Sequence, residues 1–257
     1  MTGSIDWKQV YAAVWRQQRS ALRAVQETDP VLLDSLVGID RQKQALVTNT
    51  ERFLKGKPAN NALLWGARGT GKSSLIKAIF NEYKSKNLRL IEVYKNDLSS
   101  LPEIVDDIRR LPFRFIVYCD DFSFGENENT YVVLKTILEG SIEAPPDNAI
   151  LYVTSNRRHL LPEYMKDNLD STISDGEIHY SDAIEERISL SDRFGLWLSF
   201  YAPNDEGYLK IVDSYFPQPG IDRNRLHKAA LEFSRNRASK SGRTAKQFFN
   251  QYPADES

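Results

Sequence analysis

One stretch constrains the fold of this chain more than any other: an apolar segment that passes through three glycines into an amphipathic segment. It reads Leu63-Leu64-Trp65-Gly66-Ala67-Arg68-Gly69-Thr70-Gly71-Lys72-Ser73-Ser74. The spacing fits G-x-x-x-x-G-K-[ST], a loop whose backbone N–H groups wrap phosphates and whose glycines permit positive φ and close approach. Apolar residues at helical spacing follow over 75–80. The stretch therefore predicts a strand, a phosphate-binding loop and a helix.

The loop supplies most of the expected nucleotide contacts. They come from Gly66, Ala67, Arg68, Gly69, Thr70, Gly71, Lys72, Ser73 and Ser74. Lys72 is expected to reach the terminal phosphates and the Ser73 hydroxyl to coordinate Mg²⁺. The alternative is a glycine-rich turn that binds nothing, but Lys72 and Ser73 then have no packing reason to be there. The loop predicts ATP and Mg²⁺ as ligands.

A second set of polar residues follows a buried strand. The apolar run over 113–119 ends in Asp120 and Asp121. Ligands of open α/β sheets bind at the carboxyl ends of the strands, so Asp120 is expected to hold the Mg²⁺ together with Ser73. A capping role is the alternative for each aspartate.

The order of elements predicts an α/β fold. Strands are expected over 62–65, 88–94, 113–119, 149–154 and 196–201, and helices over 41–53, 74–80, 101–110 and 130–138. Alternating strands and helices imply a five-stranded parallel sheet with helices on both faces. Beyond Pro203 only helices are expected, over 208–216, 223–237 and 244–252, and they predict a small helical lid domain.

The N-terminal segment shows a different periodicity. Trp7, Val10, Tyr11, Val14 and Trp15 recur at spacings of three and four, which predicts an amphipathic helix over 6–25. That helix either packs on the core of its own chain or serves as a partner-binding arm. The predicted organisation is an N-terminal helix (1–28), an α/β domain (29–202) and a helical lid (203–257).

Composition excludes some classes of function. The chain has 34 Lys and Arg against 35 Asp and Glu, a formal net charge of −1, so no global field draws it to nucleic acid or membranes. No apolar run approaches the roughly 18 residues of a membrane span, and no signal peptide is recognisable at the N-terminus, which predicts a cytoplasmic protein. The single cysteine, Cys119, is expected to be a small buried hydrophobe.

Five motifs in order resemble those of the AAA+ ATPases. Residues 66–73 resemble a Walker A motif, 115–121 a Walker B motif, Asn156 a sensor-1 residue, Arg193 an arginine finger and Arg243 a sensor-2 arginine. The segments over 190–196 and 241–243 also resemble a bacterial AAA+ group catalogued as domain of unknown function family 815. The resemblance runs from about residue 36 to residue 252, most of the chain.

The resemblance implies a role for each residue. Lys72 would contact the β- and γ-phosphates, Asn156 would position the attacking water, and Val37, Gly38 and Ile39 would line the adenine pocket. Arg243 would reach the γ-phosphate from the same subunit and Arg193 from a neighbouring one, which implies an oligomeric ring or spiral. The alternatives are a polar strand-end residue for Asn156, a surface or salt-bridging residue for Arg193 and a solvated residue for Arg243.

One residue departs from the family pattern. Asp121 stands where the family usually has a glutamate, and a displacement of about 1 Å can cost about 10²-fold in rate. Two functions follow: an oligomeric ATPase that acts on a macromolecular partner, or an ATP-controlled binding switch, similar to a helicase loader, with little turnover. A small-molecule kinase is weaker because it leaves Arg193 and Arg243 without roles. A GTPase is weaker still, because no N-K-x-D segment is present.

The partner is indicated only by a local run of positive charge. It consists of Arg223, Arg225, Lys228, Arg235, Arg237, Lys240, Arg243 and Lys246 on the expected lid. Such a run can meet nucleic-acid phosphates, and the alternative is a solvated lid face.

Overall fold

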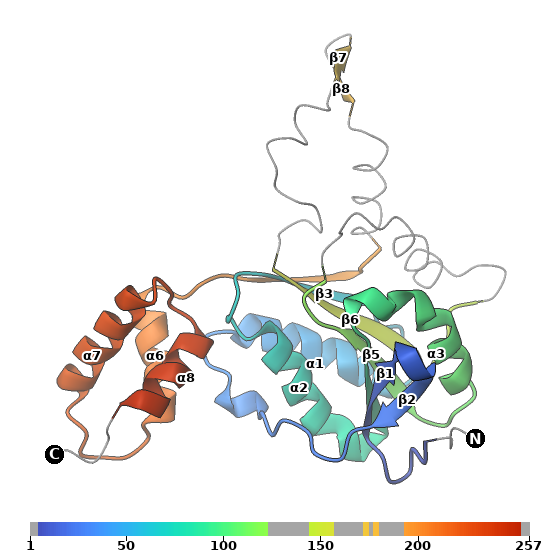
Figure 1. Cartoon of the computed structure of the whole chain (residues 1–257), viewed down its shortest axis with the longest axis horizontal. Coiled ribbons are helices and arrows are strands. Elements are labelled where there is room, and N and C mark those ends of the chain that lie inside the picture. Colours follow the sequence, from blue (N-terminus) through green and yellow to red (C-terminus); the bar gives the residue numbers. More distant parts are fainter. Residues whose placement is uncertain (1–4, 123–143, 157–171, 175–176, 180–192, 253–257) are drawn as a thin grey trace.

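The computed structural model describes residues 5–122, 144–156, 172–174, 177–179 and 193–252. An α/β body and a cluster of three C-terminal helices make up most of these residues (Figure 1). No described helix combines the length and apolar character needed to cross a bilayer.

The body is built on a seven-stranded sheet in the order β2-β1-β4-β5-β6-β3-β9. The strands are β1 (Ala12–Arg16), β2 (Ala21–Ala24), β3 (Ala62–Gly66), β4 (Leu88–Glu92), β5 (Arg114–Cys119), β6 (Ala149–Ser155) and β9 (Leu196–Phe200). All neighbouring strands are parallel except β1 and β2, which form an antiparallel pair. The five predicted strands are confirmed, in an α/β fold, but the sheet is larger by two strands at one edge.

Alternate residues of the parallel strands enter two separate cores, because successive side chains of a strand point to opposite faces. On one face, Leu63, Val117 and Val153 pack with helix α3 (Leu101–Ile108). On the other face, Leu64 and Tyr152 pack with helices α1 (Asp40–Leu54) and α2 (Lys72–Tyr83), the arrangement visible in Figure 1. Burial on both faces explains the continuous apolar runs of these strands. Short 3₁₀ turns lie between strands and helices, at Leu33–Ser35, Lys84–Lys86 and Lys95–Ser100.

The predicted N-terminal helix over residues 6–25 is wrong. The segment forms β1, the 3₁₀ turn Gln17–Arg19 and β2, and β1 joins the sheet beside β4. Trp7 and Trp15, predicted to share a helix face, both enter the core, where Trp7 contacts Phe115 edge to face at 5.0 Å between ring centroids. The spacing of apolar residues suited a helix. Pairing with β4 and β2 instead provides hydrogen-bond partners for the backbone N–H and C=O groups of β1, which is buried on both faces.

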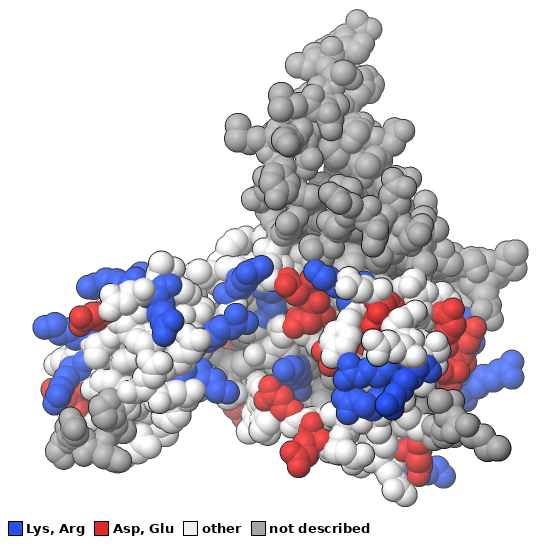
Figure 2. Space-filling view, viewed as in Figure 1, with Lys and Arg blue, Asp and Glu red and all other residues white. Residues whose placement is uncertain are grey.

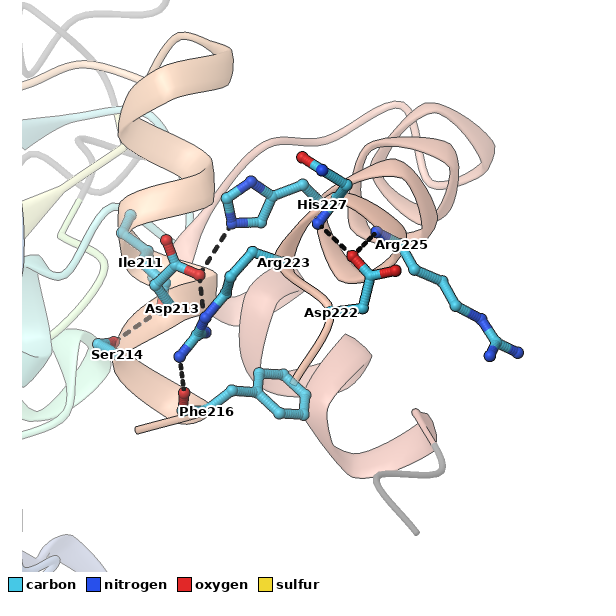
Figure 3. Close-up of polar contacts among 9 residues, drawn as sticks. Ile211, Asp213, Ser214, Phe216, Asp222, Arg223, Arg225 and His227 are labelled. Atoms are coloured by element: carbon cyan, nitrogen blue, oxygen red, sulfur yellow. Dashed lines mark hydrogen bonds and ion pairs between the residues drawn. The ribbon is translucent and has the colours of Figure 1, made fainter. Parts of the chain in front are cut away.

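The lid consists of α6 (Asp205–Tyr215), α7 (Arg223–Asn236) and α8 (Gly242–Gln251), as predicted. It has its own core, centred on Tyr208, Leu226 and Phe248. Asp213 of α6 joins α6 to α7: its carboxylate accepts from Arg223 at 3.0 Å and contacts His227 Nε2 at 2.9 Å (Figure 3). The lid is therefore a small packed unit, with its own apolar core and an ion pair between Asp213 and Arg223.

One further prediction falls outside the described residues, and another is wrong. The helix expected over 130–138 lies outside them. No element was expected over 161–181, yet Thr172–Ser174 (β7) and Glu177–His179 (β8) pair as antiparallel strands. Cys119 is a free, buried thiol, as expected, and burial raises its pKa to about 12.

Candidate nucleotide site

The loop between β3 and α2 depends on three glycines in backbone conformations that other residues rarely adopt. Gly66, Gly69 and Gly71 have φ angles of 130°, 74° and 96°. A Cβ atom at Gly66 would overlap the carbonyl oxygen of Phe200 on β9. Gly71 is the N-cap of α2, so the loop ends at a helix N-terminus, where free N–H groups and the helix dipole attract anions. The loop therefore has the geometry of a phosphate cradle.

Lys72 occupies the centre of this cradle and is only 6% exposed. Its Nζ donates to the carbonyl oxygens of Gly66 at 2.8 Å and Ala67 at 2.7 Å, and to Asn156 Oδ1 at 3.1 Å. Burial lowers the pKa of Lys72 to about 8, against the opposing effect of the Asp120 and Asp121 carboxylates. A cation that is costly to bury is thus held beside the place where phosphates would add negative charge.

Ser73 and Asp120 form a pair of oxygen ligands beside the loop. Ser73 Oγ donates to Asp120 Oδ1 at 2.7 Å, and Thr154 Oγ1 donates to the same oxygen at 2.5 Å. Burial by itself would raise the pKa of Asp120, but the hydrogen bonds from Thr154 and Ser73 outweigh it and the pKa is lowered. Asp120 is therefore kept ionised, as a metal-binding carboxylate must be.

Asp121 lies next in the chain in a left-handed conformation with φ of 50°. Its N–H donates to Thr154 Oγ1 at 2.9 Å, and its carboxylate accepts from the side-chain amide of Asn156. Thr154 and Asn156, both from the end of β6, thus hold the two aspartates in place. Aspartate tolerates the left-handed region better than longer side chains do, a physical reason for Asp rather than Glu here.

The lid touches the loop directly. The N–H of Gly242 donates to the carbonyl oxygen of Gly69 at 3.0 Å. A Cβ atom at Gly69 would lie 2.8 Å from Ser241 Oγ and 3.3 Å from the Cβ of Arg243. Ser241 caps α8 by accepting from the N–H of Thr244. The first turn of α8 therefore places Arg243 beside the phosphate loop.

Residues 37–39 approach the loop from the side of α1. Val37 and Ile39 are half-buried, and the Cδ1 of Ile39 lies 3.5 Å from where a Cβ of Gly71 would be. Gly38 between them has φ of 80°. Gln42, in the first turn of α1, donates to the carbonyl oxygen of Ser199 at 2.7 Å and fixes this segment against β9. Ile39 thus places an apolar side chain next to the phosphate cradle.

The arrangement fits a magnesium–nucleotide complex. Mg²⁺ in phosphate-transfer sites is held by one or two protein oxygens and by phosphate oxygens. Ser73 and Asp120 supply a hydroxyl and a carboxylate at one place, and Lys72, the residue before Ser73, donates to a carbonyl oxygen of the loop.

A family model matches almost the whole chain. The family described as "Protein of unknown function (DUF815)" matches residues 8–256. The chain belongs to this family. Since the family description assigns no function, it leaves the role of its phosphate loop open.

Solved structures with a similar fold include two AAA+ proteins. RuvB from Thermotoga maritima, in a point-mutant form, superposes with a TM-score of 0.57 at 16% identity, over 86% of this chain and 64% of that one. The structure of the Aeropyrum pernix Orc1 protein in complex with DNA gives 0.59 at 15% identity, over 84% and 58%. This DUF815 member therefore has the fold of the AAA+ ATPases RuvB and Orc1, and it spans about three fifths of each of those chains.

Curated relatives match a shorter part of the chain. The "Replication factor C large subunit" of Ignicoccus hospitalis is 36% identical over 70 residues, which are 26% of this chain and 14% of that protein. The protein of the same name from Staphylothermus marinus is 36% identical over 76 residues, 29% and 17% of the two lengths. The DUF815 chain thus matches only a small share of these relatives.

Arg193 is the predicted site residue that the fold does not bring to the loop. It precedes β9, which runs parallel to β3 with Leu196 opposite Ala62 and Phe200 opposite Gly66. The phosphate loop follows the carboxyl end of β3, so Arg193 lies at the other end of the strands, about 20 Å away at ~3.3 Å per residue. Within one DUF815 chain, Arg193 and the phosphate loop are at opposite ends of the sheet.

Two residues of the site were not predicted: Thr154, which binds Asp120 and the N–H of Asp121, and Ser241, which packs on Gly69. The register pairs Cys119 with Val153, so Thr154 comes level with Asp120, and the order of the strands could have indicated it. Ser241 follows the N-cap preference for serine, but its contact with Gly69 depends on how the lid docks.

Proposed function

We propose that this protein is a Mg²⁺-dependent ATPase whose turnover drives the assembly or remodelling of a macromolecular partner. The observation that carries the proposal is the connected network at the loop. Lys72 bonds to Asn156, Asn156 to Asp121 and Ser73 to Asp120, and Thr154 joins the two aspartates. A phosphate cradle alone would serve binding. A cradle joined to two carboxylates and an amide also has groups for hydrolysis.

Each residue would act on a bound nucleotide in its own way. The loop N–H groups and Lys72 would bind the phosphates, and Ser73 and Asp120 would hold Mg²⁺, which neutralises the charge that develops on the transferred phosphoryl group. Asp121 would take the proton of the attacking water, with Asn156 fixing the orientation of the carboxylate. Val37, Gly38 and Ile39 would contact the adenine.

The two arginines would complete the site from different directions. Arg243 would reach the γ-phosphate from the lid of the same chain, because Gly242 is bonded to Gly69. Arg193 lies at the far end of the strands and would serve the site of a neighbouring copy. The active form would then be a homo-oligomeric ring or spiral.

An ATP-controlled switch with little turnover is the second candidate. It is favoured by Asp121, whose side chain is one methylene shorter than glutamate and is already bonded to Asn156. In this case nucleotide occupancy would control assembly through the lid contact at Gly69, and hydrolysis would be slow.

The partner would include nucleic acid, since one structural relative, Orc1, was solved in complex with DNA. The lid contributes exposed Arg225, Lys228 and Arg235 to this proposal. Other cations of the basic run have internal partners: Arg223 pairs with Asp213, and Lys240 with Asp205.

Steady-state hydrolysis separates the two candidates. Purified protein with Mg²⁺ and ATP is compared with Asp120→Ala, which lacks the metal-binding carboxylate, and with Asp97→Ala, an acidic residue outside the network. Turnover that Asp120→Ala abolishes and Asp97→Ala retains supports the ATPase. Turnover equal to that of Asp120→Ala, with tight ATP binding, overturns it in favour of the switch.

A further inference from the structure

A second concave site lies on the β1–β2 hairpin, away from the phosphate loop. The pocket has a volume of about 510 Å³, and its lining includes Arg16, Arg19 and Arg23 with Gln17, Tyr94 and Asp97. Figure 2 shows Lys and Arg side chains gathered over the part of the molecule where Figure 1 places β1 and β2. A pocket of this size suits a small ligand or one to two units of a polymer.

The hairpin that carries the arginines is held in one geometry. Gln17 Oε1 accepts from Trp15 Nε1 at 3.0 Å and from Ser100 Oγ at 2.6 Å, which ties the turn to the segment after β4. Ser20 closes the turn in a left-handed conformation, with its N–H donating to the carbonyl oxygen of Gln17 at 3.0 Å. A rigid frame reduces the entropy that a ligand must overcome when it binds.

The arginines are arranged to meet an anion. The register pairs Arg16 with Ala21 and Val14 with Arg23, so Arg16 and Arg23 are on the same face of the hairpin. Arg19 and Arg23 are exposed, and among the described residues no carboxylate pairs with any of the three guanidinium groups at salt-bridge distance. Asp97 in the lining removes only part of this positive charge. Guanidinium groups bind phosphate oxygens through two parallel hydrogen bonds.

Tyr94 adds an aromatic surface to the pocket. Tyr94 is 45% exposed, so part of the residue is open to solvent. The guanidinium carbon of Arg16 lies 5.6 Å from its ring centroid. An exposed ring beside three arginines combines base stacking with phosphate contacts, the two interactions by which proteins bind single-stranded nucleic acid.

The pocket lies on the same edge of the sheet as the nucleotide site. Val14, Glu92 and Tyr118 are level with one another on β1, β4 and β5, so Arg16 and Tyr94 come level with Asp120 two residues later. Two strand spacings separate β1 from β5, about 10 Å. A ligand in the pocket would therefore lie near the carboxylate that we assign to Mg²⁺.

We propose that this pocket binds single-stranded nucleic acid, with its phosphates on Arg16, Arg19 and Arg23 and a base on Tyr94. The nucleic acid bound here would be the macromolecular partner of the proposed ATPase, so this assignment rests on the proposed function. Binding itself needs no ATP turnover, so the two proposals fail separately.

The test measures fluorescence anisotropy of a labelled oligothymidylate without nucleotide, over about 50 to about 200 mM salt. We expect Arg19→Gln/Arg23→Gln to weaken binding at least about tenfold and to lower the slope of log affinity against log salt by about 1.4, since each lost phosphate contact removes about 0.7. Tyr94→Leu should also weaken binding about tenfold but leave the slope unchanged.

The matched control is Lys57→Gln/Lys86→Gln, which also removes two exposed cations but lies outside both the hairpin and the lid, and it should bind within about twofold of the parent. A second variant, Arg225→Gln/Lys228→Gln/Arg235→Gln, measures the separate contribution of the lid. All variants are compared by thermal unfolding. The proposal is overturned if the parent does not bind, if the hairpin variant binds equally well, if the lid variant alone loses binding, or if thymidine monophosphate at the same phosphate concentration displaces the oligonucleotide.

Discussion

The two ends of the parallel strands differ in the number of candidate site residues they carry. At the carboxyl ends, Lys72, Asp120, Asp121 and Asn156 follow three different strands. Asn156 bonds to Lys72 and Asp121, and Thr154 bonds to both aspartates. At the amino end of β9, Arg193 stands apart from this network. Parallel strands bring their following loops to one edge whatever their separation in the chain, whereas a residue before a strand is taken to the opposite edge.

This difference indicates how the site would be shared. A residue at the amino edge of one copy can serve a site at the carboxyl edge only if a second copy brings the two edges together. Arg243, in contrast, reaches the loop through the lid of its own chain. Variants at both edges of the sheet test this division.

The largest effect is expected for Arg193→Ala. If Arg193 acts on a neighbouring site, turnover should fall about 10³-fold, the contribution of a trans-acting arginine to phosphoryl transfer. ATP affinity measured by titration calorimetry should stay within about twofold, because the carboxyl-edge groups are intact. Arg235→Ala, an exposed lid arginine, is the control and should behave as the parent.

Coexpression tests the shared site directly. Arg193→Ala and Asp120→Ala should each be inactive alone. Mixed oligomers contain some sites with an intact Asp120 and an intact Arg193 from the neighbour, so turnover should reappear. Full activity of Arg193→Ala, or a protein that stays monomeric with ATP in size measurements, would contradict the trans arrangement.

A smaller effect is expected for Asp121→Asn at the carboxyl edge. Asparagine tolerates the left-handed backbone and its side-chain oxygen can still accept from Asn156, but it cannot take a proton. Turnover should fall about 10²-fold with ATP binding retained. Single-turnover hydrolysis of labelled ATP is the measurement.

The outcome distinguishes the ATPase from the switch. In a switch with little turnover, Asp121→Asn would change neither hydrolysis nor the ATP-dependent oligomeric state. The control is Asp97→Asn, since Asp97 lies outside the network at the same edge of the sheet.

The smallest effect is expected from the titration of Lys72. Burial lowers the pKa of Lys72 to about 8. Phosphates bind the charged form, so ATP affinity should fall about fivefold between pH 8 and pH 9. Without ATP, the unfolded chain holds the proton up to a higher pH than the folded one, so stability should rise as the pH increases through 8 towards 10.5.

Calorimetry at pH 8 in buffers of different ionisation enthalpy should show uptake of about half a proton on ATP binding, because the phosphates raise the pKa of Lys72. Lys72→Arg, if it binds ATP, should show no uptake. Uptake that persists in this variant would assign the proton to another group.

The strands and the loop were predictable because their signals are local. Runs such as residues 113–119 are apolar without alternation, which indicates burial on both faces, and the glycine spacing of the loop follows from its backbone angles. The β1–β2 hairpin was not predictable from periodicity. Its apolar residues suit either element, and only the open edge of β4 decides that Ala12–Arg16 becomes a strand.

The sequence by itself determined the phosphate cradle, the five central strands and the lid helices, since each depends on residues close together in the chain. Tertiary structure alone decided that Thr154 holds both aspartates, that Ser241 and Gly242 lie on Gly69, and that Arg193 is at the other end of the sheet. The physical reason is that hydrogen bonds and charges act over a few ångströms in space, and the sheet order, not the sequence, sets those distances.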